Sequence, residues 1–300
     1  MIKLPFGVDI NNLIDDLRIL SWEASDILLS YSNLIKDLNQ KNNIIINNND
    51  DNPVTSADLK VNKLIIQRIK EKYKNINWEI LSEENFKINQ TCCDTDSKWL
   101  WILDPLDGTK DFIQGTENYA MHLALNYEQK PILGVVLIPE KDELWISYGN
   151  KLYCERREGL IKINNISDKK DLKDMSLVTS KNHKNEILKE LINKVIFKKV
   201  NVMGSIGCKV ASIIRGESDI YISLSSPGQS SPKDWDFAAP EAILKAAGGA
   251  ITTIDNKELI YNTKSFEHPG IIIASNSKKN HRSFCLQVKE VIKKYDICPL

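Results

Sequence analysis

The stretch WILDPLDGTKDF, residues 101–112, carries an apolar run into a group of acids. The pair Asp-Gly at 107–108 is a strong signal for a two-residue hairpin, which is the plain interpretation of this stretch. Pro105 opposes that interpretation, because proline removes a backbone donor where a strand ladder needs one. Asp104 directly follows the apolar run, where an unpaired buried charge would be unfavourable. We therefore expect a cation to neutralise these acids.

The spacing of these acids suits a divalent metal ion. Hard ions such as Mg²⁺ bind carboxylate, carbonyl and water oxygens, and a tight Asp-x-x-Asp turn offers Asp104, Asp107 and the Leu106 carbonyl together. A second ion needs more acids. Glu83, at the end of a predicted strand, and Asp236, at the start of a predicted helix, are the candidates. Each acid alone is more often a solvated surface residue, so a metal site requires that all of them converge.

The residues after Asp107 indicate an anion. Gly108 lets backbone N–H groups approach a phosphate, and a helix beginning near Thr109 would present further free N–H groups. Metal ions beside such a helix start describe a site for hydrolysis of a phosphate ester, in which the metal lowers the pKa of a nucleophilic water. We expect Thr109 to position that water and Asp58 to take its proton.

Composition excludes several other functions. The 300 residues can bury a large core, and 42% hydrophobic and 27% charged residues are ordinary for a globular protein. With 40 basic and 40 acidic residues and no basic, aromatic-interleaved patch, nucleic acid and anionic membranes are not expected partners. Acids at positions 9 and 15 interrupt any signal-type segment, so we expect a cytoplasmic protein. Six cysteines without CxxC spacing indicate reduced thiols.

Apolar periodicity predicts the elements of the first half of the chain. An amphipathic helix is expected over about 12–37 and a second from Ser56. NWEILSEEN, 77–85, reads as a short strand ending in two glutamates, and 119–156 alternates β-rich runs with turn residues, as in an antiparallel meander. The Asn-rich loop 38–52 leads directly to Asp58, and we hypothesise that it closes over the substrate.

The second half has a different texture. From about residue 175, strands and helices alternate, which predicts helices on both faces of a second sheet. The predicted strands are 176–180, 218–223 and 270–275, and the predicted helices are 184–195, 207–216 and 236–249. We place a soft boundary within 158–172, between an N-terminal α+β region, 1–160, with most of the metal ligands and an antiparallel sheet, and a C-terminal α/β region, 161–300, that completes the metal site and binds the ligand.

Three blocks of the sequence resemble a known family. DPLDGTKDF (104–112), LSEEN (81–85) and WDFAAPEAILKAAGG (235–249) are similar to the signatures of the lithium-sensitive, Mg²⁺-dependent inositol monophosphatase superfamily. Thr-Lys after Asp-Gly, and the run SSPGQSSPKDWDFAAPEAIL (225–244), resemble its 3′(2′),5′-bisphosphate nucleotidase branch in particular. The similarity spans about residues 53–275, and the combination of spaced blocks is highly specific.

This resemblance implies a fold and a reaction. The fold would be an αβαβα sandwich of the inositol monophosphatase and sugar phosphatase type, with the site between two sheets. The reaction would be hydrolysis of the 3′-phosphate of adenosine 3′,5′-bisphosphate (PAP) to AMP, and also of 3′-phosphoadenylyl sulfate (PAPS). Asp58 and Thr109 would activate the water. Two or three Mg²⁺ ions would be held by Glu83, Asp104, the Leu106 carbonyl, Asp107 and Asp236.

The resemblance also nominates contacts to the nucleotide. VTSKNH (178–183) and GSIGCK (204–209) are similar to elements that contact AMP in this branch, which implies His183, Ser205 and Lys209. Gly108 and Thr109 would contact the phosphate. The sequence departs from the family at Ser205, where relatives often have Gly and a backbone contact is the safer expectation, and at Ser82, which replaces the glycine before the paired glutamates.

Two alternatives to the nucleotidase stay open. The first is an inositol or sugar phosphatase of the same superfamily, because the metal machinery is shared and few residues choose the substrate. The second is a non-catalytic nucleotide or metal sensor, which would be expected to have lost one of the six residues that carry the chemistry. All six are present, namely Asp58, Glu83, Asp104, Asp107, Thr109 and Asp236. We expect a small nucleotide as the partner and a monomer or homodimer.

Overall fold

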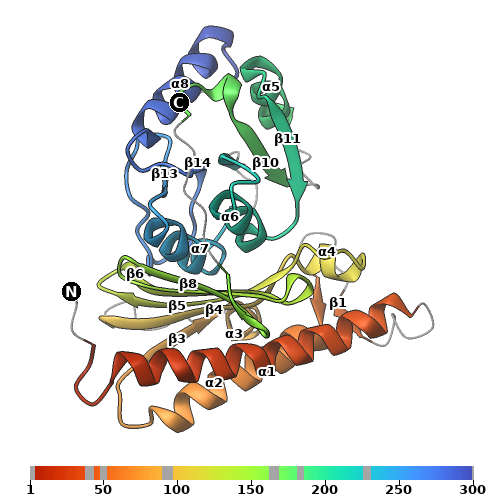
Figure 1. Cartoon of the computed structure of the whole chain (residues 1–300), viewed down its shortest axis with the longest axis vertical. Helices are drawn as coiled ribbons and strands as arrows, with labels where there is room; N and C mark the ends of the chain where they lie inside the picture. The colour runs from red at the N-terminus through yellow and green to blue at the C-terminus, as the bar shows by residue number, and fades with distance from the viewer. Residues whose placement is uncertain are drawn as a thin grey trace.

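Two sheets lie between layers of helices (Figure 1). The computed structural model describes residues 4–37, 44–47, 53–89, 97–161, 169–180, 186–225 and 231–298. In these parts of the chain, a seven-stranded sheet has the order β3-β4-β5-β6-β7-β8-β9 and a five-stranded sheet the order β11-β10-β12-β14-β13. A short ladder joins β1 (Ile45–Asn47) to β2 (Val54–Thr55). All neighbours in the seven-stranded sheet are antiparallel except β3 and β4.

The bounds of the strands are as follows. The larger sheet contains β3 (Glu79–Ser82), β4 (Trp99–Asp107), β5 (Ala120–Tyr127), β6 (Lys130–Ile138), β7 (Glu143–Tyr148), β8 (Lys151–Arg156) and β9 (Gly159–Leu160). The smaller sheet contains β10 (Ser176–Ser180), β11 (Lys199–Met203), β12 (Ile220–Ser225), β13 (Ala250–Thr253) and β14 (Gly270–Ser275). The antiparallel meander expected over 119–156 is confirmed.

The helices divide into long packing helices and short connectors. The long ones are α1 (Ile10–Lys36), α2 (Ser56–Lys72), α5 (Glu186–Val195), α6 (Ile206–Ile214), α7 (Asp234–Ala246) and α8 (His281–Tyr295). The short ones are α3 (Glu83–Asn89), α4 (Thr109–Ile113) and the 3₁₀ turns Pro139–Lys141 and Leu172–Asp174. The two predicted N-terminal helices are confirmed. Within the described residues, no helix is both long enough and apolar enough to cross a membrane.

Local sequence explains where the first two helices begin. The carboxylate of Asp9 accepts hydrogen bonds from the N–H groups of Asn11 and Asn12 at the start of α1, which satisfies donors that a helix start leaves free. Thr55 and Asp58 form a capping box at the start of α2, in which the side chain of each residue bonds to the backbone of the other residue. Asp58 is therefore fixed by the same interaction that begins its helix.

Three apolar clusters hold five layers together. Figure 1 shows α1 and α2 below the seven-stranded sheet, α6 and α7 between the sheets, and α5 and α8 at the top. The lower cluster joins α1 and α2 to the larger sheet and includes Leu17, Leu28, Ile65, Leu103 and Val135. The central cluster includes Ile102, Val136, Ile213, Ile243 and Ile272. The upper cluster includes Leu177, Leu191, Ile222, Ile273 and Phe284. The order of layers is αβαβα, as expected.

The larger sheet falls before residue 161 and the smaller one after it. The central cluster contains residues of both sheets and of α6 and α7, so the two halves share one apolar core. The division into 1–160 and 161–300 stays a prediction. Helices on both faces of the second sheet are confirmed, because α5 and α8 pack in the upper cluster and α6 and α7 in the central one.

Two expectations about local structure are wrong. The acids of residues 104–107 do not lie on a tight turn, because β4 continues through them with a shift in register: Asp104 pairs with His122 and Asp107 with Ala120. Two residues of β4, Pro105 and Leu106, therefore stand opposite the single residue Met121, and this one extra residue forms a bulge, which bends a strand without ending it. Glu83 and Glu84 begin α3 instead of ending β3. The hairpin at 107–108, which Pro105 already opposed, does not form, since the chain continues from Gly108 into α4.

Candidate active site

Three of the predicted metal ligands converge where the end of β4 meets the start of α7, and Glu83 lies outside this group of three. One carboxylate oxygen from each of Asp104, Asp107 and Asp236 lies within 4.8 Å of the others, the one such cluster found among the described residues. The β4 bulge places the first two, and the first turn of α7 places the third. Asp236 follows Asp107 by more than a hundred residues in the sequence, so its convergence with Asp104 and Asp107 is a property of the fold.

The acids lie in a largely buried site, where water solvates their charges poorly. Asp104 is 2% exposed. Burial, and then the charges of Glu83, Asp107 and Asp236, raise the pKa of Asp104 well above its usual value. Burial and the charge of Asp107 raise the pKa of Asp236 to about 8. Each acid therefore makes its neighbours harder to ionise, which is the electrostatic signature of a group that a cation would stabilise.

The donor set fits a hard divalent cation. All of the side-chain ligands are carboxylates, without a thiolate or imidazole in the group of three, which favours Mg²⁺ over zinc or copper. Backbone contacts also orient the carboxylates: the N–H of Leu106 donates to Asp104 Oδ1 at 3.0 Å, and the N–H of Lys233 donates to Asp236 Oδ2 at 2.6 Å. Such bonds hold each carboxylate in one rotamer, ready for an ion.

Asp107 is anchored by the N-terminus of α6. Its Oδ2 accepts hydrogen bonds from the Ser205 hydroxyl at 2.6 Å and from the Ile206 N–H at 2.5 Å. His122 on β5 lies on the other side, with Nε2 3.3 Å from the same oxygen. The His122 ring is fully buried, and burial lowers its pKa. The sequence analysis missed His122, whose only signal was its place in the β-rich run that forms β5.

Asp58 and Thr109, the predicted pair that activates the water, lie in contact with each other, and their catalytic roles stay predictions. The Thr109 hydroxyl donates to the Leu106 carbonyl at 2.9 Å and lies 3.4 Å from Asp58 Oδ1. Asp58 Oδ2 accepts from the Thr55 N–H at 2.8 Å and the Thr55 hydroxyl at 2.5 Å. Burial is the main cause that raises the pKa of Asp58 to about 7. A carboxyl with that pKa suits proton transfer near neutral pH.

Comparison with known proteins assigns the family. The model of the inositol monophosphatase family matches residues 12–293. The chain belongs to the inositol monophosphatase family. The 3′(2′),5′-bisphosphate nucleotidase CysQ of Buchnera aphidicola is 30% identical over 269 residues, which cover 88% of this chain and 95% of that protein. CysQ of Escherichia coli strain K12 is 26% identical over 268 residues, 87% of this chain and 99% of that protein.

Solved structures confirm the family fold. The inositol monophosphatase of Thermotoga maritima aligns with a TM-score of 0.72 at 21% identity, over 95% of this chain and 99% of that one. CysQ of Bacteroides thetaiotaomicron aligns with a TM-score of 0.66 at 24% identity, over 85% of this chain and 94% of that one. At these identities the structures show the αβαβα fold and nothing finer.

The predicted nucleotide contacts of this family member lie mostly inside the protein. Ser205 is fully buried, and its hydroxyl donates to Asp107 and accepts from the Cys208 N–H. Lys209 is 2% exposed, donates to the Gly204 carbonyl and lies 5.2 Å from the centre of the Tyr221 ring. His183 and most of loop 38–52 fall outside the described residues. Contacts from these residues to AMP, and loop closure, stay predictions.

Gly108 has a steric role in the site. Its φ of 88° lies in the left-handed region, and a Cβ there would lie 2.8 Å from the Asn118 carbonyl oxygen and 3.2 Å from the Ser205 nitrogen. Glycine therefore lets the end of β4 approach the start of α6, which brings Asp107 to its anchors. Its predicted contact with phosphate stays a prediction.

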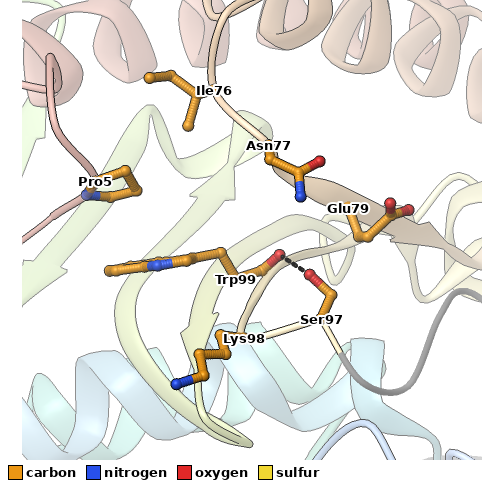
Figure 2. Close-up of a pocket in the computed structure, with 7 residues that line it drawn as sticks. All are labelled: Pro5, Ile76, Asn77, Glu79, Ser97, Lys98 and Trp99. Atoms are coloured by element: carbon orange, nitrogen blue, oxygen red, sulfur yellow. Dashed lines mark hydrogen bonds between the residues drawn. The ribbon is translucent and has the colours of Figure 1, made fainter.

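A separate cavity lies far from this chemistry. Figure 2 shows Trp99, Lys98 and Asn77 beside a cavity of about 410 Å³. These residues stand at the beginnings of β3 and β4, whereas Glu83 and Asp104 follow the carboxyl ends of the paired segments. In an α/β architecture the functional groups gather at the carboxyl ends of parallel strands, which agrees with the site at the acids.

Proposed function

We propose that this chain is a Mg²⁺-dependent phosphatase that removes the 3′-phosphate of PAP to give AMP and phosphate. The observation that carries the proposal is the convergence of Asp104, Asp107 and Asp236 beside the pair Asp58 and Thr109. The relatives named as bisphosphate nucleotidases support the choice of substrate. We extend the proposal to PAPS as a second substrate, and to a role in sulfur assimilation and nucleotide recycling.

The acids would supply the metal site. Glu83, Asp104, Asp107, Asp236 and the Leu106 carbonyl would hold two or three Mg²⁺ ions. When bound, such ions lower the pKa of a nucleophilic water and stabilise the leaving oxygen of a phosphate ester. The buried acids that raise one another's pKa, and their all-oxygen donor set, support this assignment.

The protein's own groups would handle the proton. Thr109 would orient the attacking water, and Asp58 would accept its proton as the water oxygen bonds to phosphorus. The bond between phosphorus and the 3′-oxygen breaks, and that oxygen leaves with the AMP and takes up a proton from solvent. The contact of the Thr109 hydroxyl with both Asp58 and the Leu106 carbonyl would keep the nucleophile between the base and the metal site.

The main rival is an inositol or sugar phosphatase, which would use the same acids. Asp104 and Asp107 lie on β4 and Asp236 lies in the first turn of α7, and one fold with one set of metal ligands can serve several substrates. Figure 1 shows α7 packed beside the seven-stranded sheet. The similarity to CysQ over nearly the whole chain favours the nucleotide. The presence of all six chemical residues favours a catalyst over a sensor.

Phosphate release distinguishes these functions. Purified protein is assayed with PAP, PAPS, inositol 1-phosphate and fructose 1,6-bisphosphate, each with Mg²⁺ and with a chelator. We expect the highest kcat/KM with PAP, and no turnover with the chelator. A wide preference for the inositol ester or the sugar would refute the nucleotidase, and full activity in the chelator would refute the metal site.

A further inference from the structure

A lysine stands beside one of the predicted metal ligands. Lys87 lies one helical turn after Glu83 in α3, and its Nζ is 3.0 Å from Glu83 Oε1 and 2.8 Å from Glu84 Oε1. The three side chains are 16%, 15% and 2% exposed respectively. An ammonium group therefore bridges two adjacent carboxylates in a place that water reaches poorly.

This environment makes the bridge electrostatically strong. Carboxylate oxygens of both Glu83 and Glu84 lie within 3.0 Å of the Lys87 nitrogen, and two such neighbours favour the charged ammonium. Opposite charges attract far more strongly at a shielded site than at an exposed surface, where most ion pairs contribute little. Both carboxylates thus have a cation at hand without any ion from solvent.

Glu83 also differs from the other acids in its position. The group of three converging carboxylates contains Asp104, Asp107 and Asp236, and Glu83 stands outside it. Glu83 nevertheless lies near enough that its charge raises the pKa of Asp104, after the effect of burial. It therefore lies between the aspartate cluster on one side and Lys87 on the other.

We propose that Lys87 is a tethered competitor for the metal ion that uses Glu83, and that Glu84 retains the ammonium when Glu83 binds metal. This inference rests on the metal site of the proposed function. A divalent ion at Glu83 and the ammonium of Lys87 attract the same carboxylate and repel each other. Glu84, already 2.8 Å from Nζ, keeps Lys87 paired, so no buried charge is left alone.

The consequence is two classes of metal affinity. Within the described parts of the chain, no lysine forms an ion pair with Asp104, Asp107 or Asp236, whereas an ion that uses Glu83 must displace Lys87. Lys87 therefore weakens the second class and leaves the first nearly unchanged. Removal of Glu84 should weaken the second class further, because Lys87 would then pair with Glu83 alone.

Calorimetric titration with Mg²⁺, and with Mn²⁺ followed by electron paramagnetic resonance, tests this without any substrate. In Lys87→Gln we expect the weaker class to tighten about tenfold, since one neighbouring positive charge is removed, and the tighter class to change less than about twofold. Glu84→Gln should shift the weaker class in the opposite direction. Lys63→Gln, at an exposed position on α2, is the matched control and should leave both classes unchanged.

Each result has a defined meaning. Unchanged or weaker binding in Lys87→Gln would overturn the competition, while a wild-type protein that binds no divalent ion would overturn the metal site itself. If Lys87→Gln does not fold because Glu84 loses its partner, the double variant Glu84→Gln, Lys87→Gln has no charge at either position. The double variant should show the same tightening of the weaker class, and its failure to do so would also overturn the inference.

Discussion

Asp107 shows how a single carboxylate can serve the fold and the site together. One of its oxygens accepts hydrogen bonds from the Ser205 hydroxyl and the Ile206 N–H, and faces His122. Ser205 and Ile206 lie at the start of α6 and His122 lies on β5, so Asp107 links β4 to both elements. Because the anchoring bonds engage Oδ2, the carboxylate is oriented before any ligand arrives, which lowers the entropy lost on binding.

We expect Asp107→Asn to abolish most activity while the fold persists. An asparagine can direct its carbonyl oxygen to the donors of α6, but it then offers an amide nitrogen and no charge to the metal. Loss of one ligand should lower kcat/KM and Mg²⁺ affinity by at least about a hundredfold. Phosphate release and calorimetric titration measure the two effects, with circular dichroism as the check on folding. Asp26→Asn, at an exposed position on α1, is the control. Near-normal turnover in Asp107→Asn would mean that the site is misplaced.

At the residue scale, the acids could be predicted and their supports could not. The predicted carboxylates are marked by their position after strands and by their motif context. His122 lies in a β-rich run, where nothing in the neighbouring sequence marks it as a site residue. Its partner, Asp107, is 15 positions away in the sequence and lies on the adjacent strand. Long-range register decides such contacts, and register is not visible in one strand. The burial of Lys209 also depends on how α6 packs.

Among the elements, α6 depends on a close approach to the larger sheet. Gly207, in the first turn of α6, lies against β5 and β6, and a Cβ there would be 2.3 Å from His122 Nε2 and 2.8 Å from Val136 Cγ1. The helix can approach only because this position has no side chain. The same approach brings the Ile206 N–H to Asp107.

Gly207→Ala should therefore destabilise the protein although alanine favours helices. Overpacking costs about 1–3 kcal/mol, against a gain in helix propensity of about 1 kcal/mol. We expect a net loss of up to about 2 kcal/mol in the free energy of unfolding by urea. The double variant Gly207→Ala, His122→Ser removes the obstructing ring. Its loss should be smaller than the sum of the two single losses, and strict additivity would show that the ring and the helix are not in steric conflict.

The sequence predicted elements where the apolar pattern is strong and missed those where it is weak. β11 is an edge strand whose five residues are all exposed or half-buried, so it lacks the alternation of a buried strand. β13 is four residues long and follows a Gly-Gly pair, which reads as the end of a helix. α8 is different, because Phe284, Val288 and Ile292 recur every four residues and the signal was readable. The bulge in β4 could not be read, since it needs its partner strand.

For the molecule as a whole, the five layers place the acidic site in the middle. Different residues stabilise the outer layers. α8 packs on the outer face of the five-stranded sheet, in the upper apolar cluster. His281 begins α8 and is 2% exposed, with Nδ1 2.7 Å from the Ser275 hydroxyl and Nε2 2.8 Å from the Thr252 hydroxyl. The two hydroxyls can satisfy both nitrogens of a neutral imidazole with hydrogen bonds. Neither hydroxyl carries a negative charge that could stabilise a protonated ring.

Acid should therefore weaken the folded state through His281. Burial lowers the pKa of its ring to about 4 in the folded protein, against an unfolded value of 6.5. Above pH 6.5 the ring is neutral in both states, so this contribution to stability is complete. As the pH falls from 6.5 towards 4, the unfolded state binds a proton that the folded state excludes. By pH 4.5 the loss should reach about 2.5 kcal/mol.

Urea unfolding at pH 7 and pH 4.5 measures the total change in the free energy of unfolding. A variant without His281 separates the contribution of this ring from that of all other titrating groups. In His281→Gln the difference in unfolding free energy between the two pH values should shrink by about 2.5 kcal/mol, because no group at that position can be protonated. Arg282→Gln, the exposed neighbour on α8, should keep the full difference. If His281→Gln kept it too, the acid sensitivity would originate in carboxylates whose pKa folding lowers, such as Glu140 and Glu217, and not in the contact that holds α8 to the smaller sheet.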